Sequence, residues 1–315
     1  MPASSTLGQT STFYCCLNSS GVGEALYGTA TQASVWLLIE YPGTWSAQAL
    51  KDSDIPLAVK EHLARWTGSN PEARLQLIRR SGSPASSKIT VFLALPVQDH
   101  PIVHRWILDR YDQLLDIDLE DASNSEVTGH SLYPESLFLT CTNGRRDRCC
   151  NKFGLPVYSN LSALHPENTW ETTHLGGHRF AANLLCFPHG LLYGRVIPAD
   201  AGEIVRTYQA GSIVLEKFRG RVCLPEPAQA AEYFLRDKLL QYAVDALQFQ
   251  RIVQPSENKW RVIFSNQETR NQFLIDLHAE PAGFKTFMNC TDEHGKEIDR
   301  YELDGIEIQH WPEEA

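Results

Sequence analysis

Apolar positions in the first third of the chain form short continuous runs separated by an amphipathic segment. The runs "SVWLLIEYP" (34–42), "ARLQLIRR" (73–80) and "KITVFLALP" (88–96) are strand-like. Between the first two runs, "PLAVKEHLARW" (56–66) has the spacing of a helix with one apolar face. Alternating strands and helices are typical of a mixed α/β domain, which we predict here.

The segment that follows carries a helical pattern. "VHRWILDRYDQLLDIDL" (103–119) places Trp106, Ile107 and Tyr111 on roughly one helical face with two leucines. We therefore predict a helix over this stretch. The polar run "DASNSEVTG" (121–129) comes next and indicates a domain boundary.

A second unit opens with the short strand "SLFLT" (136–140), which leads directly into Cys141. Further on, the apolar runs 182–188 and 191–197 flank the dipeptide His189-Gly190, a pattern that predicts a β-hairpin. A helix is expected over 199–211, with Gly211 as its C-cap. This order of strand, cysteine loop, helix, strand, histidine loop, hairpin and helix is that of a thioredoxin-like fold.

The last third has a different pattern. A helix is predicted over 227–247, and five short segments after it alternate apolar with polar residues, as in a small antiparallel sheet with one wet face. We therefore predict three domains. They are an α/β domain over 1–128, a related thioredoxin-like α/β domain over 129–225, and a helix with a small β-rich domain over 226–315.

Composition narrows the class of protein. Of the 315 residues, 43% are hydrophobic and 21% are charged, which is ordinary for a globular chain. A net charge of -10 argues against a nucleic-acid surface, because such a surface needs clustered Lys and Arg. The start of the chain has no signal-peptide pattern, and the apolar run at 35–39 is too short to span a bilayer. We therefore expect a cytoplasmic protein without a membrane span.

Cysteine and histidine gather in two neighbouring stretches. "CTNGRRDRCC" (141–150) holds three of the eight cysteines, and "THLGGHRF" (173–180) holds two histidines four residues apart. Cys141 and Cys150, at the two ends of the first stretch, combine with His174 and His178 into a Cys2His2 donor set. Thiolates and imidazoles are the donors that both zinc and iron–sulfur clusters require. The pattern predicts a metal site.

The spacing bears on which metal is bound. Zinc knuckles usually place their cysteines two to four residues apart, whereas eight residues separate Cys141 from Cys150 and leave room for a larger [2Fe-2S] core. His174 and His178 could share one face of a helix. The Gly-Gly pair between them would destabilise a helix by about 1 kcal/mol per residue, so we predict a loop there.

Several other residues are weaker candidates. Adjacent Cys15 and Cys16 could act as a redox thiol pair or simply lie buried. We expect Cys186, Cys223 and Cys290 to be small buried apolar residues, and His189 to be a turn residue. Four arginines lie near the predicted ligands, namely Arg145, Arg146, Arg148 and Arg179. They could neutralise the negative charge of a cluster, guide a redox partner, or be ordinary surface charges.

Three segments of the chain match one family together. In order they are "LYGTATQASVWLLIEYPGTW", "CTNGRRDRCCNKFGLPVY" and "WETTHLGGHRFAANLLCFPHGLLYGRV". Over about residues 14–222 the chain closely resembles the sucrase/ferredoxin-like family, whose core is similar to thioredoxin-like [2Fe-2S] ferredoxins.

The resemblance implies a [2Fe-2S] cluster held by Cys141, Cys150, His174 and His178. Cys149 would then be a spare thiol or a core residue. By analogy with Rieske centres, we expect both histidines on the outer iron.

The function implied is that of a one-electron carrier or redox sensor, rather than an enzyme, serving a redox partner protein that the sequence does not identify. The alternative is a structural Cys2His2 zinc module that mediates interactions. A glycoside hydrolase, which the word sucrase suggests, needs two carboxylates set across the bond, and the sequence singles out no such pair.

Overall fold

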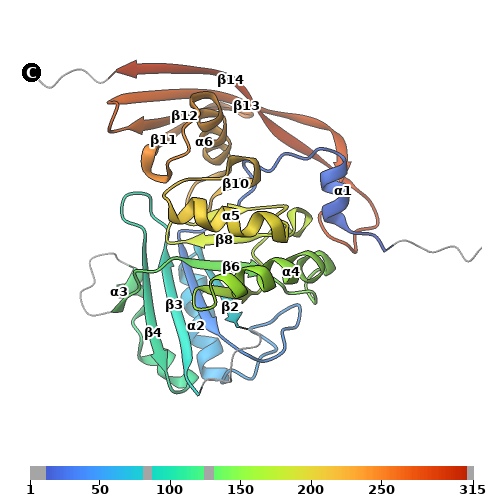
Figure 1. Ribbon diagram of the computed structural model, residues 1–315, viewed down its shortest axis with the longest axis vertical. Helices are drawn as coiled ribbons and strands as arrows, with labels where there is room; N and C mark the ends of the chain where they lie inside the picture. Colours follow the sequence, from blue (N-terminus) through green and yellow to red (C-terminus); the bar gives the residue numbers. More distant parts are fainter. Residues whose placement is uncertain (1–11, 81–86, 124–130, 311–315) are drawn as a thin grey trace, which may run out of the picture.

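Two β-sheets organise the protein (Figure 1). The computed structural model describes residues 12–80, 87–123 and 131–310. Within these residues a ten-stranded mixed sheet forms the body of the molecule and a four-stranded antiparallel sheet covers one end of it. The first eleven residues and the boundary predicted between 128 and 129 lie outside the described residues.

The first half of the large sheet is one α/β unit. Its elements are α1 (Cys15–Gly21), β1 (Val35–Glu40), α2 (Leu57–Ser69), β2 (Ala73–Arg79), β3 (Ile89–Leu95), β4 (Ile102–Leu108), η1 (Tyr111–Asp116), α3 (Leu119–Ser123) and β5 (Ser131–Leu132). β1 pairs parallel with β2 and antiparallel with β3, which pairs antiparallel with β4. Successive residues of β1 are buried on opposite faces, which explains its continuous apolar run. The predicted α/β pattern of this region is confirmed.

The predicted helix over 103–119 is wrong. Residues up to Leu108 belong to β4, which pairs in register with β3, and only Tyr111–Asp116 turn into a short 3-10 helix. The β-branched and aromatic residues Val103, Trp106 and Ile107 favour a strand, and a partner strand lies beside them. Pairing with β3 therefore outweighed the helical spacing of the apolar residues in this segment.

The second half repeats this topology. Its elements are β6 (Leu137–Cys141), α4 (Arg148–Leu164), β7 (Thr169–Thr172), η2 (His178–Phe180), β8 (Leu184–Phe187), β9 (Leu191–Tyr193), α5 (Pro198–Gln209), η3 (Leu215–Lys217) and β10 (Phe218–Arg221). β6 pairs parallel with β7 and antiparallel with β8, which pairs antiparallel with β9. This is the strand pattern of the thioredoxin fold. The predicted hairpin is confirmed, and so is the helix ending near Gly211, whose φ is 78°.

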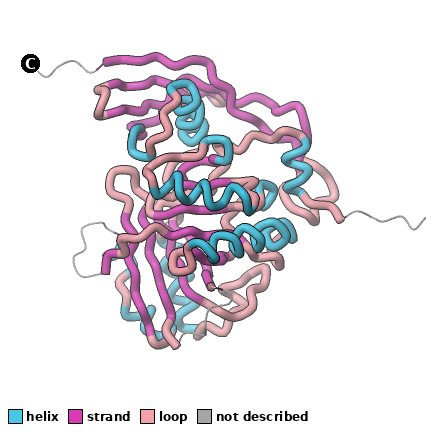
Figure 2. Tube along the Cα trace, viewed as in Figure 1, coloured by secondary structure: helices cyan, strands magenta, loops and turns pink. Residues whose placement is uncertain are grey.

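The two halves join along their edge strands. β2 and β7 pair antiparallel, which gives the order β10-β9-β8-β6-β7-β2-β1-β3-β4-β5. Figure 2 shows the strands in magenta and the helices in cyan. Buried side chains from both halves, among them Trp36, Leu139 and Trp170, form one shared core on a face of this sheet. The halves are therefore two copies of one topology within a single sheet.

The C-terminal region consists of a helix and a meander. Its elements are α6 (Glu226–Leu239), η4 (Val244–Ala246), β11 (Gln248–Ser256), β12 (Lys259–Asn266), β13 (Asn271–Thr286) and β14 (Lys296–His310). The predicted helix over 227–247 is too long by two turns, because Leu240 adopts a left-handed conformation that ends it. The antiparallel sheet packs Phe264 and Ile275 against α6, while Arg261 and Asp276 pair on its wet face.

The long hairpin of β13 and β14 extends past the small sheet and reaches α1, at the right of the view in Figure 1. The loop between the two strands carries Cys290. In the described part of the chain, no helix combines the length and apolar character needed to cross a membrane.

Candidate metal centre

The two cysteines predicted as ligands are supplied by one strand end and the helix that follows it. Cys141 is the last residue of β6, and Cys150 lies in the first turn of α4. Asp147 caps this helix, since its carboxylate accepts a hydrogen bond from the Cys149 amide at 2.8 Å. A Cβ at Gly154 would lie 2.1 Å from the carbonyl oxygen of Cys141, so glycine there lets α4 pack directly on β6. Strand, cap and glycine together fix the two sulfur atoms.

Cys141, Cys150 and His174 form one group. Their ligand atoms all lie within 4.8 Å of one another, and Cys150 Sγ is 3.9 Å from His174 Nδ1. Both thiols are buried, and a hydrogen bond with Cys150 lowers the pKa of the Cys141 thiol well below its usual value, against the effect of burial. The structure thus brings three of the four predicted residues to one point.

The fourth, His178, stands beside His174. The two ring centroids are 4.7 Å apart, and His178 Nε2 lies 3.9 Å from a carboxylate oxygen of Asp147. Burial, helped by the neighbouring His174, lowers the pKa of His178, which favours a neutral ring at neutral pH. A neutral imidazole is the form that coordinates metals.

The segment between the histidines is a loop, as predicted. Gly176 and Gly177 have φ angles of 96° and 65°, which are left-handed and favour glycine. A Cβ on Gly176 would lie 1.9 Å from Thr31 Oγ1, and one on Gly177 would lie 2.4 Å from an Arg219 guanidinium nitrogen. The glycines therefore allow close packing against these two residues, which holds both rings in place.

The histidine side of the group faces a surface depression. This depression, of about 400 Å³, lies beside half-buried His174 and is lined by Lys51, Arg74 and Arg146. Among the described residues, no acidic side chain lines it. The thiols therefore lie inside the protein, whereas His174 is half-buried beside a depression with positively charged side chains.

The other predicted residues have varied positions. Arg145 and Arg148 line a neighbouring depression, and Arg179 forms an ion pair with Glu24 at 2.7 Å. Cys186 is buried in β8, and Cys223 is half-buried after β10. Cys15, Cys16, Cys149 and Cys290 share a separate cluster.

Asp147 was not among the candidate residues predicted from the sequence. It caps the start of α4 and lies beside His178. An aspartate directly before a helix is a common N-cap, and this position is the signal in the sequence that could have identified it.

The donor set fits an iron–sulfur or zinc centre. Two thiols and the His174 imidazole converge, the His178 ring lies beside His174, and Nδ1 of His178 is buried with no hydrogen-bond partner among the described residues. A buried polar atom without a partner is costly, and metal coordination would satisfy it. The Nε2 atom of the same ring lies 3.9 Å from Asp147, and in many metal sites a carboxylate accepts a hydrogen bond from the ring nitrogen that does not bind the metal.

Fold and site together define a candidate metalloprotein with a thioredoxin-like half and mixed thiol and imidazole donors. The chain belongs to the sucrase/ferredoxin-like family, whose model matches residues 26–220. That segment includes both halves of the large sheet and all four predicted ligands.

Curated relatives carry the name altered inheritance of mitochondria protein 32. The protein from Meyerozyma guilliermondii is 36% identical over 99 residues, which are 28% of this chain and 35% of the relative. The protein from Candida glabrata is 26% identical over 126 residues, 33% of this chain and 40% of the relative. The matched segments thus span between a third and two fifths of these relatives.

Among solved structures, two variants of the thioredoxin-like [2Fe-2S] ferredoxin from Aquifex aeolicus are similar to this chain. Each is 18% identical with a TM-score of 0.25, and the match covers 28% of this chain and 100% of the ferredoxin.

Proposed function

We propose that the protein transfers single electrons through a [2Fe-2S] cluster held by Cys141, Cys150, His174 and His178. The observation that carries the proposal is the convergence of two buried thiols with two histidines at the end of a thioredoxin-like strand. Membership in the sucrase/ferredoxin-like family supports the same assignment.

The position of each residue suits electron transfer. The buried thiols and helix α4 shield the inner side, and His174 lines the depression that also carries basic residues. A redox partner protein with acidic side chains fits this face, because opposite charges speed the encounter of two proteins. The cytoplasmic location expected from the sequence stays a prediction.

The choice of donors sets the chemistry. A cluster with neutral imidazoles in place of two thiolates is less negative and accepts an electron more readily than an all-cysteine cluster. An imidazole can also gain or lose a proton, which would couple the electron to a proton and make the potential fall as pH rises. Here His178 faces Asp147, which can accept a hydrogen bond from its ring.

The first test is a visible spectrum of protein purified without oxygen, with iron, acid-labile sulfide and zinc assayed on the same sample. We expect visible bands that dithionite bleaches, with about two iron and two sulfide per chain. Colourless protein without iron, carrying zinc at the Cys2His2 group, would instead support the structural module.

A second test replaces one predicted ligand. His178→Cys should lower the reduction potential and flatten its dependence on pH, because a thiolate adds negative charge and removes a titrating ring. The matched control is His100→Cys, which changes an exposed histidine outside the site. The same potential and slope in His178→Cys as in the wild type would exclude His178 as a ligand.

A further inference from the structure

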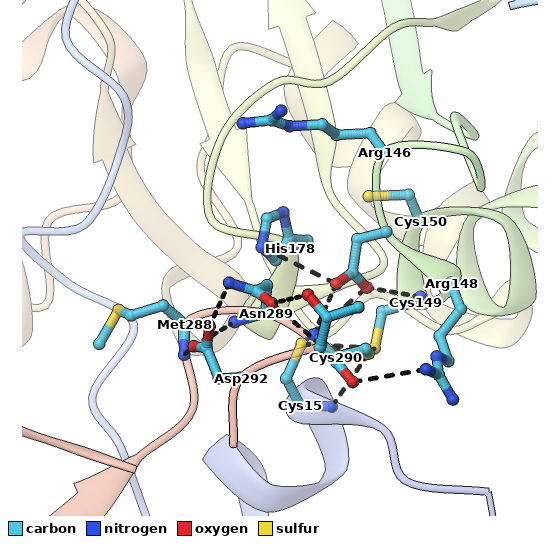
Figure 3. Close-up of polar contacts among 12 residues, drawn as sticks. Cys15, Arg146, Arg148, Cys149, Cys150, His178, Met288, Asn289, Cys290 and Asp292 are labelled. Carbon is cyan, nitrogen blue, oxygen red and sulfur yellow. Dashed lines mark hydrogen bonds and ion pairs between the residues drawn. The ribbon is translucent and has the colours of Figure 1, made fainter. Parts of the chain in front are cut away.

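A second group of thiols lies apart from the predicted cluster ligands. Cys15 in α1, Cys149 in α4 and Cys290 in the β13–β14 loop meet beside Asp147 (Figure 3). All four residues are buried, and their ligand atoms lie within 4.8 Å of one another. These segments are far apart in the chain, since Cys15 and Cys290 are separated by 275 positions.

The three sulfur atoms form a nearly regular triangle. Cys149 Sγ lies 3.6 Å from Cys15 Sγ and 3.2 Å from Cys290 Sγ, and the remaining edge is 3.5 Å. Disulfide sulfurs are about 2 Å apart, whereas two thiolates on one tetrahedral zinc, each at about 2.3 Å from the metal, lie about 3.8 Å apart. The triangle is therefore close to one face of a zinc–thiolate tetrahedron.

An oxygen donor stands beside the triangle. Asp147 Oδ1 lies 4.0 Å from Cys15 Sγ, and the same carboxylate accepts hydrogen bonds from the backbone amides of Cys149 and Cys290 at 2.8 and 2.7 Å. Carboxylate oxygen is an ordinary zinc ligand. Asp147 thus ties two of the cysteines in place and presents an oxygen to the third.

The buried charge of Asp147 requires a cation. Within the described residues no lysine or arginine forms an ion pair with it, and the basic side chain within ion-pair distance is His178, at 3.9 Å. Buried charges in proteins are normally paired or coordinate a metal. A cation held by the sulfur triangle would supply the missing charge.

Neighbouring groups favour negative charge on Cys149, since a hydrogen bond from Cys15 lowers the pKa of its thiol. The same hydrogen bond raises the pKa of the Cys15 thiol, and burial raises that of Cys290, so a cation at the triangle would have to offset both effects. The backbone amide of Cys15 donates to Cys290 Sγ at 3.3 Å, and the start of α4 directs its positive dipole end toward Cys149. Arg148 reaches the carbonyl oxygen of Cys290 at 3.4 Å and adds positive charge nearby.

This group is distinct from the candidate centre. Cys149 and Cys150 are adjacent in α4, so their side chains point in different directions around the helix axis. Cys150 belongs to the same core cluster as Cys141. Cys149 instead packs with Cys15 and Cys290 (Figure 3). The two neighbouring thiols therefore serve different sites.

We propose that Cys15, Cys149, Cys290 and Asp147 bind one zinc ion as a structural site. Zinc prefers four tetrahedral ligands drawn from thiolate, imidazole and carboxylate, and a closed, buried set of four is typical of structural sites. The ion displaces the thiol protons and undergoes no redox change. It joins the N-terminal helix, the start of α4 and the C-terminal hairpin, so that the last third of the chain contributes a ligand beside the candidate cluster.

The test is zinc content measured on the full chain purified without oxygen and passed over a chelating resin. We expect about one more zinc per chain in the wild type than in Cys290→Ser or Cys15→Ser. The matched control, Cys223→Ser, changes a half-buried cysteine outside both groups and should keep the zinc of the wild type. Iron and sulfide are assayed on the same samples, and their retention in the variants shows that the rest of the fold is intact.

X-ray absorption at the zinc edge of the wild type tests the ligands without any substitution. Three sulfur atoms and one oxygen at the zinc support the proposal. Two sulfurs with two imidazole nitrogens would overturn it, because that set belongs to the other centre. Wild-type protein with no zinc, or with the same zinc content as Cys290→Ser and Cys15→Ser, would also overturn it. The difference in zinc content between the wild type and the two variants is expected whether the Cys2His2 group holds an iron–sulfur cluster or zinc, and the zinc ligands are read from protein with about one zinc per chain in total.

Discussion

At the scale of single residues, function depends on which way a side chain points. Cys149 and Cys150 are adjacent in the chain, yet Cys149 groups with Cys15 and Cys150 groups with Cys141. The family resemblance favoured Cys150 as the ligand, but the sequence gave Cys149 no partner, because Cys15 and Cys290 lie far from it in the chain. Asp147 lies between the two groups, since it faces His178 on one side and Cys290 on the other.

The surroundings of His189 predict how the free energy of unfolding depends on pH. Its Nδ1 lies 2.7 Å from the Tyr208 hydroxyl, its Nε2 lies 3.6 Å from Asp245, and burial lowers its pKa to about 4. The nearby Arg221 also lowers the pKa, while Asp245 opposes the shift. Unfolding restores an ordinary value of about 6.5, so between pH 6.5 and 4 the unfolded chain binds more protons.

The free energy of unfolding should therefore fall as the pH drops through this window, with His189 contributing up to about 3 kcal/mol of the loss. Urea unfolding of the wild type and His189→Gln at pH 7 and pH 4.5 measures it. A smaller loss in the variant is expected. An equal loss in both proteins would show that His189 does not carry this dependence.

At the scale of elements, the site depends on how closely helix α4 approaches strand β6. Gly154 faces the carbonyl group of Cys141, and its missing side chain allows the contact that places Cys150 beside Cys141. The aspartate cap fixes the start of the same helix. A small residue in the middle of a helix thus determines the distance between two candidate ligands.

Gly154→Ala should displace α4 from β6 and weaken the candidate centre. The added methyl group would meet a backbone atom at 2.1 Å, which cannot move without shifting the strand. We expect a loss of about 2 kcal/mol in unfolding free energy and a lower iron content per chain. The matched control is Gly68→Ala in α2, where nothing lies within 4 Å of the new methyl group and alanine should stabilise the helix by about 0.5–1 kcal/mol.

Most elements could be predicted from local pattern, and the exceptions have physical causes. The runs around Leu37, Leu77 and Leu93 became strands because they are buried on at least one face of the sheet. The segment at 103–119 was misassigned because an adjacent strand outweighed helical spacing. The cluster around Cys290 could not be foreseen, since it depends on a hairpin that brings this residue to positions 15 and 149.

At the scale of the whole molecule, a buried ionic network connects the large sheet to the C-terminal region. Glu232 in α6 accepts hydrogen bonds from Arg221 of β10 and from Arg236 one turn along, each at 2.9 Å. All three side chains are almost completely buried. Both arginines also donate to the carbonyl oxygen of Val244, which ties the 3-10 turn after α6 to the network.

Glu232→Gln should lower the free energy of unfolding by about 3–5 kcal/mol, because two buried guanidinium groups lose the carboxylate with which both form ion pairs. Thermal and urea unfolding measure the loss. Glu280→Gln, which removes an exposed partner of Arg300, is the control and should change stability by less than about 1 kcal/mol. Equal effects of the two substitutions would contradict the role given to the buried network.

The junction of the two halves implies an internal two-fold symmetry. Ile78 of β2 pairs with Thr172 of β7, and each of them also pairs with the last residue of the preceding parallel strand, Glu40 or Cys141. A pseudo-dyad therefore passes through the Ile78–Thr172 pair and relates Cys141 to Glu40, whose carboxylate binds the Thr90 amide at 2.9 Å. The chain therefore resembles a dimer of two α/β units joined in one polypeptide. The second unit holds the candidate metal ligands, and the first, which lacks them, pairs with the edge strand β7 of the second.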